Sequence, residues 1–359
     1  MIIFQLIQKP QLRGAEIFAA QLSQEMEKSG HTVFLIALFP GVATLPFSGQ
    51  VLPLNRPIAK RWTDFEGWKQ FANLIEQHQP DVIQCNAGDT LKFAVLSKFL
   101  HRWKTPLVAR NASMVSSYIR NPFTRWINKK LYQQTQAILS VSQLSANDLN
   151  RLFPETTSKT TVIPIGVCSH EIQPVHWRNE SKAPINVIHV GGFTFEKNHT
   201  GLLSIFQQFL VHHPEAHLHL LGDGPLRAAI ESLVVQNRLT ESVTFYGFVP
   251  NVMDYIHHAD VLVLPSIIEG LPGVLLEAFY VRTPVVAYNV GGISEILANQ
   301  LTGFLVTAGD ESGFVTALQK ALQPEITADL VMNSHQLVEE KYTIASLAQA
   351  FESNYRNLI

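Results

Sequence analysis

Two glutamates flank a glycine-containing turn within Pro265–Ala278. Glu269 comes just before Gly270 and Gly273, Glu277 follows them, and seven residues separate the two carboxylates. The turn follows an apolar run and leads into an expected helix, whose free N–H groups and dipole favour a bound anion. Two carboxylates beside such a turn can accept hydrogen bonds from the hydroxyls of a sugar and a ribose. The alternative is that both only complement the positive helix end, which fits Glu277 poorly because it lies too deep in the helix.

A lysine lies in a second turn between an apolar run and a helix, within Val190–His199. Lys197 falls near the expected N-terminus of the helix, which is the unfavourable end for a cation. A bound diphosphate would reverse that preference. The alternative is a solvated lysine beside Asn198, with the asparagine serving as the helix cap.

Three further turns have weaker signals. Gly222 and Gly224 follow an apolar run and would join the nucleotide site if they lie beside the other two turns. Phe248 follows another apolar run and borders either a base or the core. Gly14, in the loop Lys9–Glu16, could bring backbone N–H groups to a phosphate.

The elements that must position these residues alternate between apolar strands and amphipathic helices. Continuous Val, Ile and Leu runs separated by helices indicate parallel sheets covered on both faces. The expected strands are Ile2–Ile7, Thr32–Leu38, Asp81–Cys85, Pro106–Arg110, Ala137–Val141, Ile185–Val190, His217–Leu221, Val243–Tyr246, Asp260–Leu264, Val285–Tyr288 and Gly303–Val306.

Eleven strands are too many for one simple doubly wound sheet, so the sequence predicts an α/β protein with two such domains. We expect an N-terminal domain over 1–165, a Pro- and Gly-containing linker over 166–183 and a C-terminal domain over 184–343. In doubly wound sheets ligands bind beyond the carboxyl ends of the strands. The two sets of loops would then face each other across a central cleft.

Composition excludes several classes of protein. The chain has 359 residues, with 27 Lys or Arg against 29 Asp or Glu, so charge gives no argument for nucleic-acid binding. Two cysteines exclude a disulfide scaffold and a four-thiolate zinc site. No Asp-x-Asp occurs, nor any His-Glu-x-x-His, so we expect no metal and no other cofactor. Without an unbroken apolar run or a basic leader, we expect a cytoplasmic protein.

The motifs together resemble those of GT-B glycosyltransferases of family 4. The resemblance covers nearly the whole chain and rests on Glu269 with Glu277, on Lys197 after Val190-Gly191, on the Leu221–Leu226 turn and on the Gly14 loop. It implies the GT-B fold, two Rossmann-like αβα domains, with the C-terminal helix 344–359 crossing back to the N-terminal domain. The N-terminal domain would bind the acceptor and the C-terminal domain the donor.

The resemblance also implies roles. Glu269 would hold hydroxyls of the donor sugar, Glu277 the ribose and Lys197 the diphosphate. The expected donor-binding residues are Gly14, Gly222, Gly224, Phe248, Gly270, Leu271, Gly273, Val274, Leu275 and Glu277.

Two positions depart from the family pattern. Gly192 stands where the family often has an arginine after the first glycine of the lysine motif. A histidine that the family often has after the fourth or fifth strand is also missing. We expect Asn111 to take its catalytic place beside Lys197 and Glu269. The expected acceptor-side residues are Arg13, Asn86, Asp89 and Arg110.

Basic residues are concentrated in 90–147, which holds nine Lys or Arg and no Asp or Glu, with aromatic residues between them. This predicts a face for an anionic membrane or acceptor. The alternative is a solvated face or a basic wall of the active site.

The expected function is metal-independent, retaining transfer of a hexose-type sugar from a UDP- or GDP-linked donor to a polysaccharide, glycan or lipid-linked acceptor, a transferase of class EC 2.4. The enzyme would lie in the cytoplasm, or peripherally at the inner face of the membrane. Two alternatives are a non-hydrolysing nucleotide-sugar epimerase of the same architecture and a non-catalytic nucleotide-sugar-binding protein.

Overall fold

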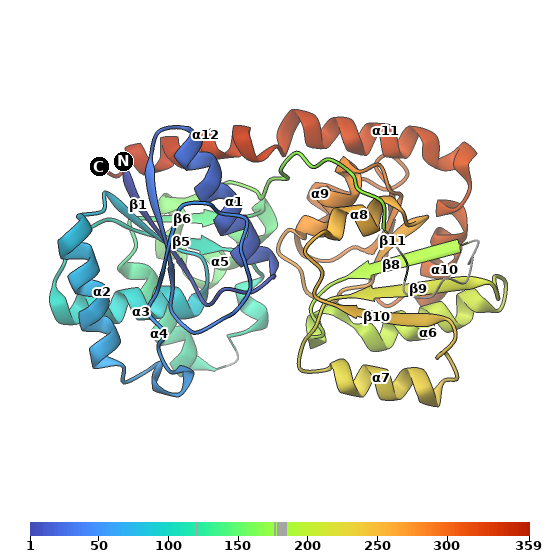
Figure 1. Cartoon of the computed structure of the whole chain (residues 1–359), viewed down its shortest axis with the longest axis horizontal. Helices are drawn as coiled ribbons and strands as arrows, with labels where there is room; N and C mark the ends of the chain where they lie inside the picture. The colour runs from blue at the N-terminus through green and yellow to red at the C-terminus, as the bar shows by residue number, and fades with distance from the viewer. Residues whose placement is uncertain (120, 176, 178–184) are drawn as a thin grey trace. The chain divides into compact units, whose positions relative to one another are not determined.

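The computed structural model describes residues 1–119, 121–175, 177 and 185–359. The chain forms two compact units, each built around one parallel sheet (Figure 1). The first unit comprises Met1–Cys168 together with Ile344–Ile359, and the second comprises Ser169–Thr343.

The first unit has a parallel sheet with the strand order β3-β2-β1-β4-β5-β6-β7. Adjacent strands are in parallel register, as between Gln5 of β1 and Gln84 of β4. The strands are β1 Ile2–Ile7, β2 Thr32–Ala37, β3 Gln50–Pro53, β4 Val82–Cys85, β5 Leu107–Asn111, β6 Ala137–Ser140 and β7 Thr160–Val162.

Helices cover both faces of this sheet. One face packs against α1 and α12 through Phe18, Leu22, Phe351 and Tyr355, and the rings of Phe18 and Phe351 lie 5.9 Å apart. The other face packs against α2, α3, α4 and α5. The helices are α1 Gly14–Lys28, α2 Phe65–His78, α3 Gly88–His101, α4 Pro122–Gln133, α5 Gln143–Leu152 and α12 Ile344–Arg356, with short 3-10 turns at Ile58–Lys60, Val115–Ser117 and Pro154–Lys159.

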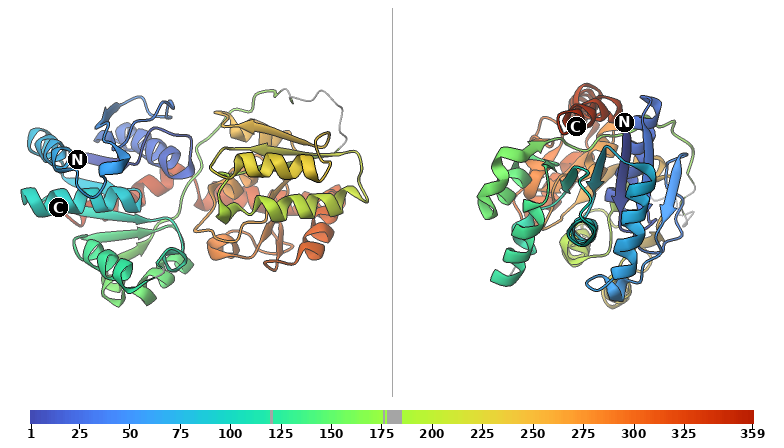
Figure 2. Two further views of the ribbon diagram at one scale, coloured as in Figure 1. Left: turned by 90° about the horizontal axis from the view of Figure 1, so that it is seen from below. Right: turned by 90° about the vertical axis from the view of Figure 1, so that its left-hand side faces the viewer.

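The second unit repeats this plan with the strand order β10-β9-β8-β11-β12-β13. Its largest core lies between the sheet and α6, α7 and α10, and α6 and α7 are seen in front of the sheet in Figure 2, left. The strands are β8 Ile185–Val190, β9 Ala216–Leu221, β10 Val243–Gly247, β11 Val261–Leu264, β12 Val285–Tyr288 and β13 Phe304–Val306. The helices are α6 His199–Leu210, α7 Arg227–Gln236, α8 Val252–His257, α9 Gly273–Tyr280, α10 Glu311–Ala321 and α11 Pro324–Lys341, with 3-10 turns at Phe195–Lys197 and Gly291–Glu295.

In both sheets the first strand of the unit lies near the centre, and the order in which later strands are added reverses beside it. This order is typical of doubly wound Rossmann-like sheets. The expected fold class is therefore confirmed, and every expected strand is present within a residue or two. Two edge strands, β3 and β7, are additional. Both are short and poorly buried, and β3 ends on Pro53, so they lack the apolar runs that mark a central strand.

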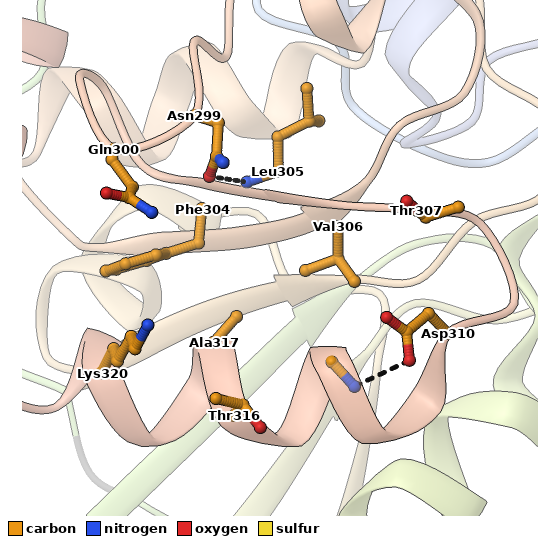
Figure 3. Close-up of a pocket in the computed structure, with 11 residues that line it drawn as sticks. Asn299, Gln300, Phe304, Leu305, Val306, Thr307, Asp310, Thr316, Ala317 and Lys320 are labelled. Atoms are coloured by element: carbon orange, nitrogen blue, oxygen red, sulfur yellow. Dashed lines mark hydrogen bonds between the residues drawn. The ribbon is translucent and has the colours of Figure 1, made fainter.

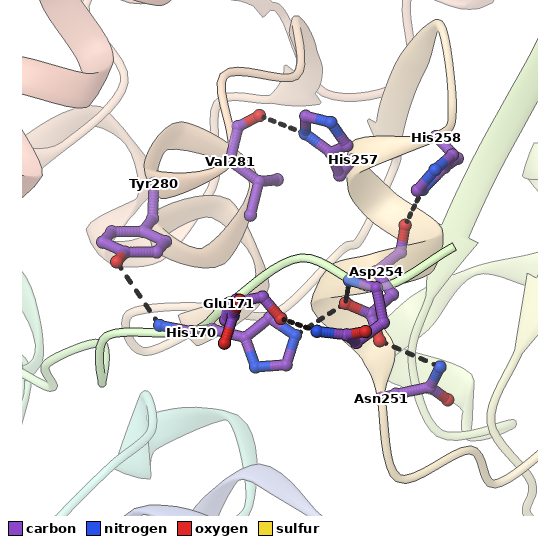
Figure 4. A network of polar contacts seen from close by, with 9 residues as sticks. His170, Glu171, Asn251, Asp254, His257, His258, Tyr280 and Val281 are labelled. Atoms are coloured by element: carbon purple, nitrogen blue, oxygen red, sulfur yellow. Dashed lines mark hydrogen bonds and ion pairs between the residues drawn. The ribbon is translucent and has the colours of Figure 1, made fainter. Parts of the chain in front are cut away.

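Residues 169–175, expected within a linker, are attached to the second unit (Figure 4). The carboxylate of Asp254 lies 2.6 Å from His170 Nε2 and accepts a hydrogen bond from the backbone N–H of Gln173 at 3.0 Å. Burial alone would raise the pKa of Asp254, but these contacts and one from Asn251 lower it. The rest of the expected linker, apart from Gly166–Cys168 of the first unit and residue 177, lies outside the described residues.

Candidate functional site

Two glycine turns of the second unit interlock at the carboxyl ends of β8 and β9. The N–H of Gly191 donates to Leu221 O at 2.9 Å, and the N–H of Phe193 donates to Asp223 O at 3.1 Å. A Cβ at Gly222 would lie 2.1 Å from the carbonyl oxygen of Gly191, and Gly222 has a φ of +126°. Glycine is therefore required here, and the Gly222 turn does adjoin the lysine turn.

The lysine turn is also joined to the glutamate turn that follows β11. Asn198 Nδ2 donates to Pro265 O at 3.1 Å, and the N–H of Ile267 donates to Glu196 O at 2.8 Å. Asn198 also accepts from the N–H of Gly201, so it caps α6, as the alternative interpretation of this turn had it. Segments about seventy residues apart thus form one rigid set of loops at a single sheet edge.

Lys197 and Glu269 form an ion pair in this set of loops. Lys197 Nζ donates to Glu269 Oε1 at 2.5 Å, and the two side chains are 22% and 9% exposed. A charge-assisted bond of this kind is shorter and stronger than a bond between neutral groups, and it orients the two side chains toward each other. The structure therefore brings together the two charged residues for which the sequence predicted separate contacts, one to phosphate and one to sugar.

Two buried histidines pack beneath the lysine turn. His189 Nδ1 lies 2.9 Å from Val263 O, and the ring of His199 stacks on Phe193 with centroids 4.0 Å apart. Burial, reinforced by the charge of Lys197, lowers the pKa of His199 to about 4. Burial also lowers the pKa of His189 well below its usual value. Both imidazoles are neutral at pH 7, so they add no charge beside Lys197.

The N-terminus of α9 follows the glutamate turn. Pro272 is the N-cap residue, and it gives the helix no side-chain cap. The first N–H groups of α9 therefore lack a side-chain acceptor from the cap residue. Glu277 lies in the second turn, half-buried, and burial raises the pKa of its carboxyl to about 7.

The other expected donor-binding residues differ in exposure. Phe248 is 45% exposed just after β10. Leu271 and Leu275 are buried, so only their backbone groups are suited to a ligand, and Val274 is half-buried. Gly224 lies close to the backbone of Phe193. A Cβ added to Gly224 would lie 2.7 Å from the carbonyl oxygen of Phe193.

The acceptor-side candidates lie in the first unit, and most are bonded within it. Asn86 donates to Gln5 Oε1 and Leu6 O, and Asn111 donates to Ser140 Oγ and Ser145 O. These contacts give both amides a structural role at the ends of β4 and β5.

Four expected site residues of the first unit remain: Arg13, Gly14, Asp89 and Arg110. Asp89 pairs with Lys92 at 2.8 Å, Arg13 is exposed, and Gly14 begins α1 with open space where a Cβ would lie. Arg110 is buried, with its guanidinium 3.7 Å above the Phe18 ring.

The basic stretch 90–147 presents fewer surface charges than its sequence suggests. Lys92 and Arg110 are buried, and Arg120 lies outside the described residues. The exposed part is clearest on α4, where the rings of Phe123 and Trp126 stack with centroids 6.3 Å apart and are 68% and 57% exposed. Exposed cations of the stretch are Arg102, Lys104, Arg125, Lys129 and Lys130.

A hollow of about 320 Å³ lies between β13 and α10 (Figure 3). None of the expected site residues lines it. Its polar groups serve local structure, since Asp310 caps α10 through the N–H of Gly313 and Asn299 accepts from the N–H of Leu305. We therefore assign the functional site to the interlocked loops instead.

No role was predicted for His189 and His199, which lie beside Lys197, or for Ser266 of the glutamate turn. Ser266 is fully buried, and its Oγ has no hydrogen-bond partner among the described residues. The available signal was position alone, because His199 follows Lys197-Asn198 directly and Ser266 opens the glutamate turn.

Two family models match the chain over almost its whole length. The model described as Glycosyltransferase Family 4 matches residues 12–170, and the one described as Glycosyl transferases group 1 matches residues 174–341.

Curated relatives agree with these models. Sulfoquinovosyl transferase SQD2 of Arabidopsis thaliana is 27% identical over 75% of this chain and 55% of its own length. An uncharacterized glycosyltransferase of Methanocaldococcus jannaschii, MJ1607, is 23% identical over 96% of this chain and 94% of its own. The chain thus spans about half of SQD2 and nearly all of MJ1607.

Solved structures share the fold. Anabaena Alr3699/HepE, crystallised with UDP and glucose, superposes with a TM-score of 0.81 at 17% identity, covering 99% of this chain and 100% of that one. Sucrose-phosphate synthase of Thermosynechococcus elongatus superposes with a TM-score of 0.84 at 20% identity, covering 99% and 98%.

Proposed function

We propose a function from the premise that this chain belongs to the GT-B glycosyltransferases of family 4. In this proposal the enzyme transfers a hexose-type sugar from a UDP- or GDP-linked donor to a glycan or lipid-linked acceptor. The configuration at the anomeric carbon is retained. The observation that carries the proposal is the joining of the Lys197, Gly222 and Glu269 turns at one sheet edge of the second unit. Neighbours of the same fold were crystallised with UDP and glucose or with UDP-glucose, which supports a nucleotide sugar as the donor.

In this proposal the loops act by electrostatic stabilisation of the leaving group. Negative charge grows on the β-phosphate as the glycosidic bond breaks. Lys197 and the N–H groups at the start of α9 are fixed donors for that charge, and fixed donors cost no reorganisation during the reaction. Lys197 would exchange its contact with Glu269 for the diphosphate, which leaves Glu269 to accept hydrogen bonds from the sugar.

The proposal is tested by a thermal-shift screen of the purified chain against UDP-, GDP- and ADP-sugars. A bound donor raises the apparent stability by RT ln(1 + [L]/Kd), so the correct base and sugar give the largest rise in Tm. Incubation of that donor with and without acceptors then separates transfer from epimerisation. No rise with any nucleotide sugar, together with no product, would contradict the proposal.

We also expect the transfer to need no divalent cation. The sequence contains no Asp-x-Asp, the two-carboxylate pattern that could hold a metal against a diphosphate. Activity in EDTA should equal activity in buffer with Mg²⁺ within about twofold. Loss in EDTA that Mg²⁺ or Mn²⁺ restores would show a metal site.

A further expectation concerns the α4 face, defined by Phe123, Trp126 and the exposed cations Arg125, Lys129 and Lys130. No helix among the described residues has the length and apolarity to cross a membrane. Basic residues near an anionic surface contribute about 1 kcal/mol each, so this face should bind anionic vesicles at low salt. Binding should fade at high salt, because the charges are exposed and screened.

The vesicle experiment compares two triple variants by co-sedimentation. Replacing Arg125, Lys129 and Lys130 by serine should weaken binding about tenfold or more. The same replacement of Lys60, Arg61 and Lys69, which are also exposed on the first unit, should leave it unchanged. Equal binding of both variants, or equal binding to neutral and anionic vesicles, would favour a soluble acceptor.

A further inference from the structure

Two of the three nitrogens of the buried Arg110 guanidinium have no hydrogen-bond partner among the described residues. The residue is 7% exposed near the end of β5, and the two nitrogens without a partner in the described part of the chain are Nε and Nη1. Nε carries one N–H and Nη1 carries two, so three donors are left unused. No ion pair joins Arg110 to a carboxylate among the described residues.

The surroundings of Arg110 are aromatic and neutral. Its guanidinium lies over the ring of Phe18, one turn after Gly14 in α1, and beside Tyr355 of α12. The Tyr355 hydroxyl donates to Gln84 Oε1 at 2.6 Å and accepts from Gln5 Nε2 at 3.2 Å, so it is committed elsewhere. Burial lowers the pKa of Arg110 to about 9, so the group is still charged at pH 7.

The buried acidic side chain of α1 forms no ion pair with this cation among the described residues. Glu16 lies in the first turn of the helix, where it is buried and hydrogen-bonded to Gln11. Burial raises the pKa of Glu16, and the hydrogen bond with Gln11 opposes that shift. An unpaired buried cation is costly to a fold, and such costs are concentrated at functional sites.

We propose that Arg110 binds a carboxylate or phosphate group of the acceptor and thereby selects an anionic acceptor. This inference rests on the proposed function, because it assigns the ligand to the acceptor. Three observations support an oxyanion: unused N–H donors, no competing carboxylate, and a position at the carboxyl edge of the sheet, where doubly wound folds bind ligands. Asn86 and Asn111, at the same edge, already use their amides within the fold.

The first experiment measures the Tm of the full chain with dimethyl phosphate or acetate, at an ionic strength held constant with chloride. We expect a rise of about 1 °C or more for the wild type, and the larger rise identifies phosphate or carboxylate as the favoured group. Trimethyl phosphate and acetamide, the uncharged counterparts, should give none. Arg110→Met should give no rise with any probe, whereas Arg61→Met, an exposed arginine of the same unit, should respond like the wild type.

Two readouts distinguish binding from a structural role. Without probes, Arg110→Met should melt about 2 °C or more above the wild type, because it removes an unpaired buried charge. With the donor identified, Arg110→Met should raise the KM for anionic acceptors about tenfold or more and leave the KM for the donor unchanged. Arg110→Lys, which keeps the charge but loses the planar donors, should give an intermediate KM.

An equal probe response in wild type and Arg110→Met would overturn the assignment, as would a lower Tm for Arg110→Met together with an unchanged KM. If Arg110→Met does not fold, the probe response of Arg110→Lys decides, and a response equal to wild type overturns the inference. The donor screen is independent of these results. A failed donor screen with a positive probe response would reject the transferase and keep the anion site.

Discussion

Replacing Lys197 by alanine is expected to lower kcat about 100-fold. The variant should still be folded at the temperature of the assay, as its Tm would show. The ammonium group would meet a charge that grows only as the glycosidic bond breaks, so its loss acts mainly on the transition state. Turnover is measured with the donor found in the thermal-shift screen, and Kd for the free nucleoside diphosphate is measured by calorimetry.

The control must allow for the ion pair. Alanine at position 197 leaves the buried carboxylate of Glu269 unpaired, which can itself destabilise the loops. Lys197→Gln keeps a hydrogen-bond donor without the charge and should lose kcat to a similar extent. Lys341→Ala, at an exposed position at the end of α11, should retain full activity. A kcat near normal in folded Lys197→Gln would contradict the leaving-group role.

The Glu277→Ala variant should lose about 1.5–3 kcal/mol of binding free energy for the donor and for the free nucleotide alike, since the lost contact is a hydrogen bond to a charged acceptor. Calorimetry with the nucleoside diphosphate measures this directly. Glu295→Ala, a glutamate at the end of the 3-10 turn after β12, is the matched control. Unchanged nucleotide affinity in Glu277→Ala would remove the ribose contact.

The same residue predicts a pH dependence. Burial raises the pKa of Glu277 to about 7, so its ionised fraction rises from roughly one tenth at pH 6 to nine tenths at pH 8. Nucleotide affinity relative to Glu277→Gln should therefore increase several-fold over that range. The folded state favours the protonated carboxyl, so its contribution to stability is present below pH 4.5 and is lost as the pH rises through 7. Glu277→Gln should then melt above the wild type at pH 8.

The fold and the site of the second unit were largely predictable from the sequence because their signals are local. Central strands such as β8 and β12 are continuous apolar runs, and their ends are marked by glycine turns. Since parallel strands end at one sheet edge, turns far apart in sequence had to meet, as the Asn198–Pro265 contact shows. The ion pair between Lys197 and Glu269 was not predicted, because spacing along the chain does not reveal which charges pair.

The first unit was harder to predict because its signals depend on tertiary burial. Lys92 and Arg110 counted equally in a basic stretch, yet both are buried, and only Lys92 has a carboxylate partner among the described residues. Asn111 stays a prediction for catalysis, and the sequence could not show that its amide also donates to Ser140 Oγ and Ser145 O. The edge strands β3 and β7 were missed since their stability comes from pairing with a neighbour, not from their own apolar pattern.

The division of the chain has a consequence for biosynthesis. The second unit is continuous, so all of its core has left the ribosome once Thr343 has emerged. Most of the first unit is synthesised before the second unit, but at that stage α12 has not yet been made. Phe351 and Tyr355 of α12 cover Phe18 and the amides of Gln5 and Gln84. Until α12 has emerged, only α1 covers that sheet face, and a nascent chain is open to aggregation or chaperone binding there. The first unit therefore begins before the second unit and is completed after it.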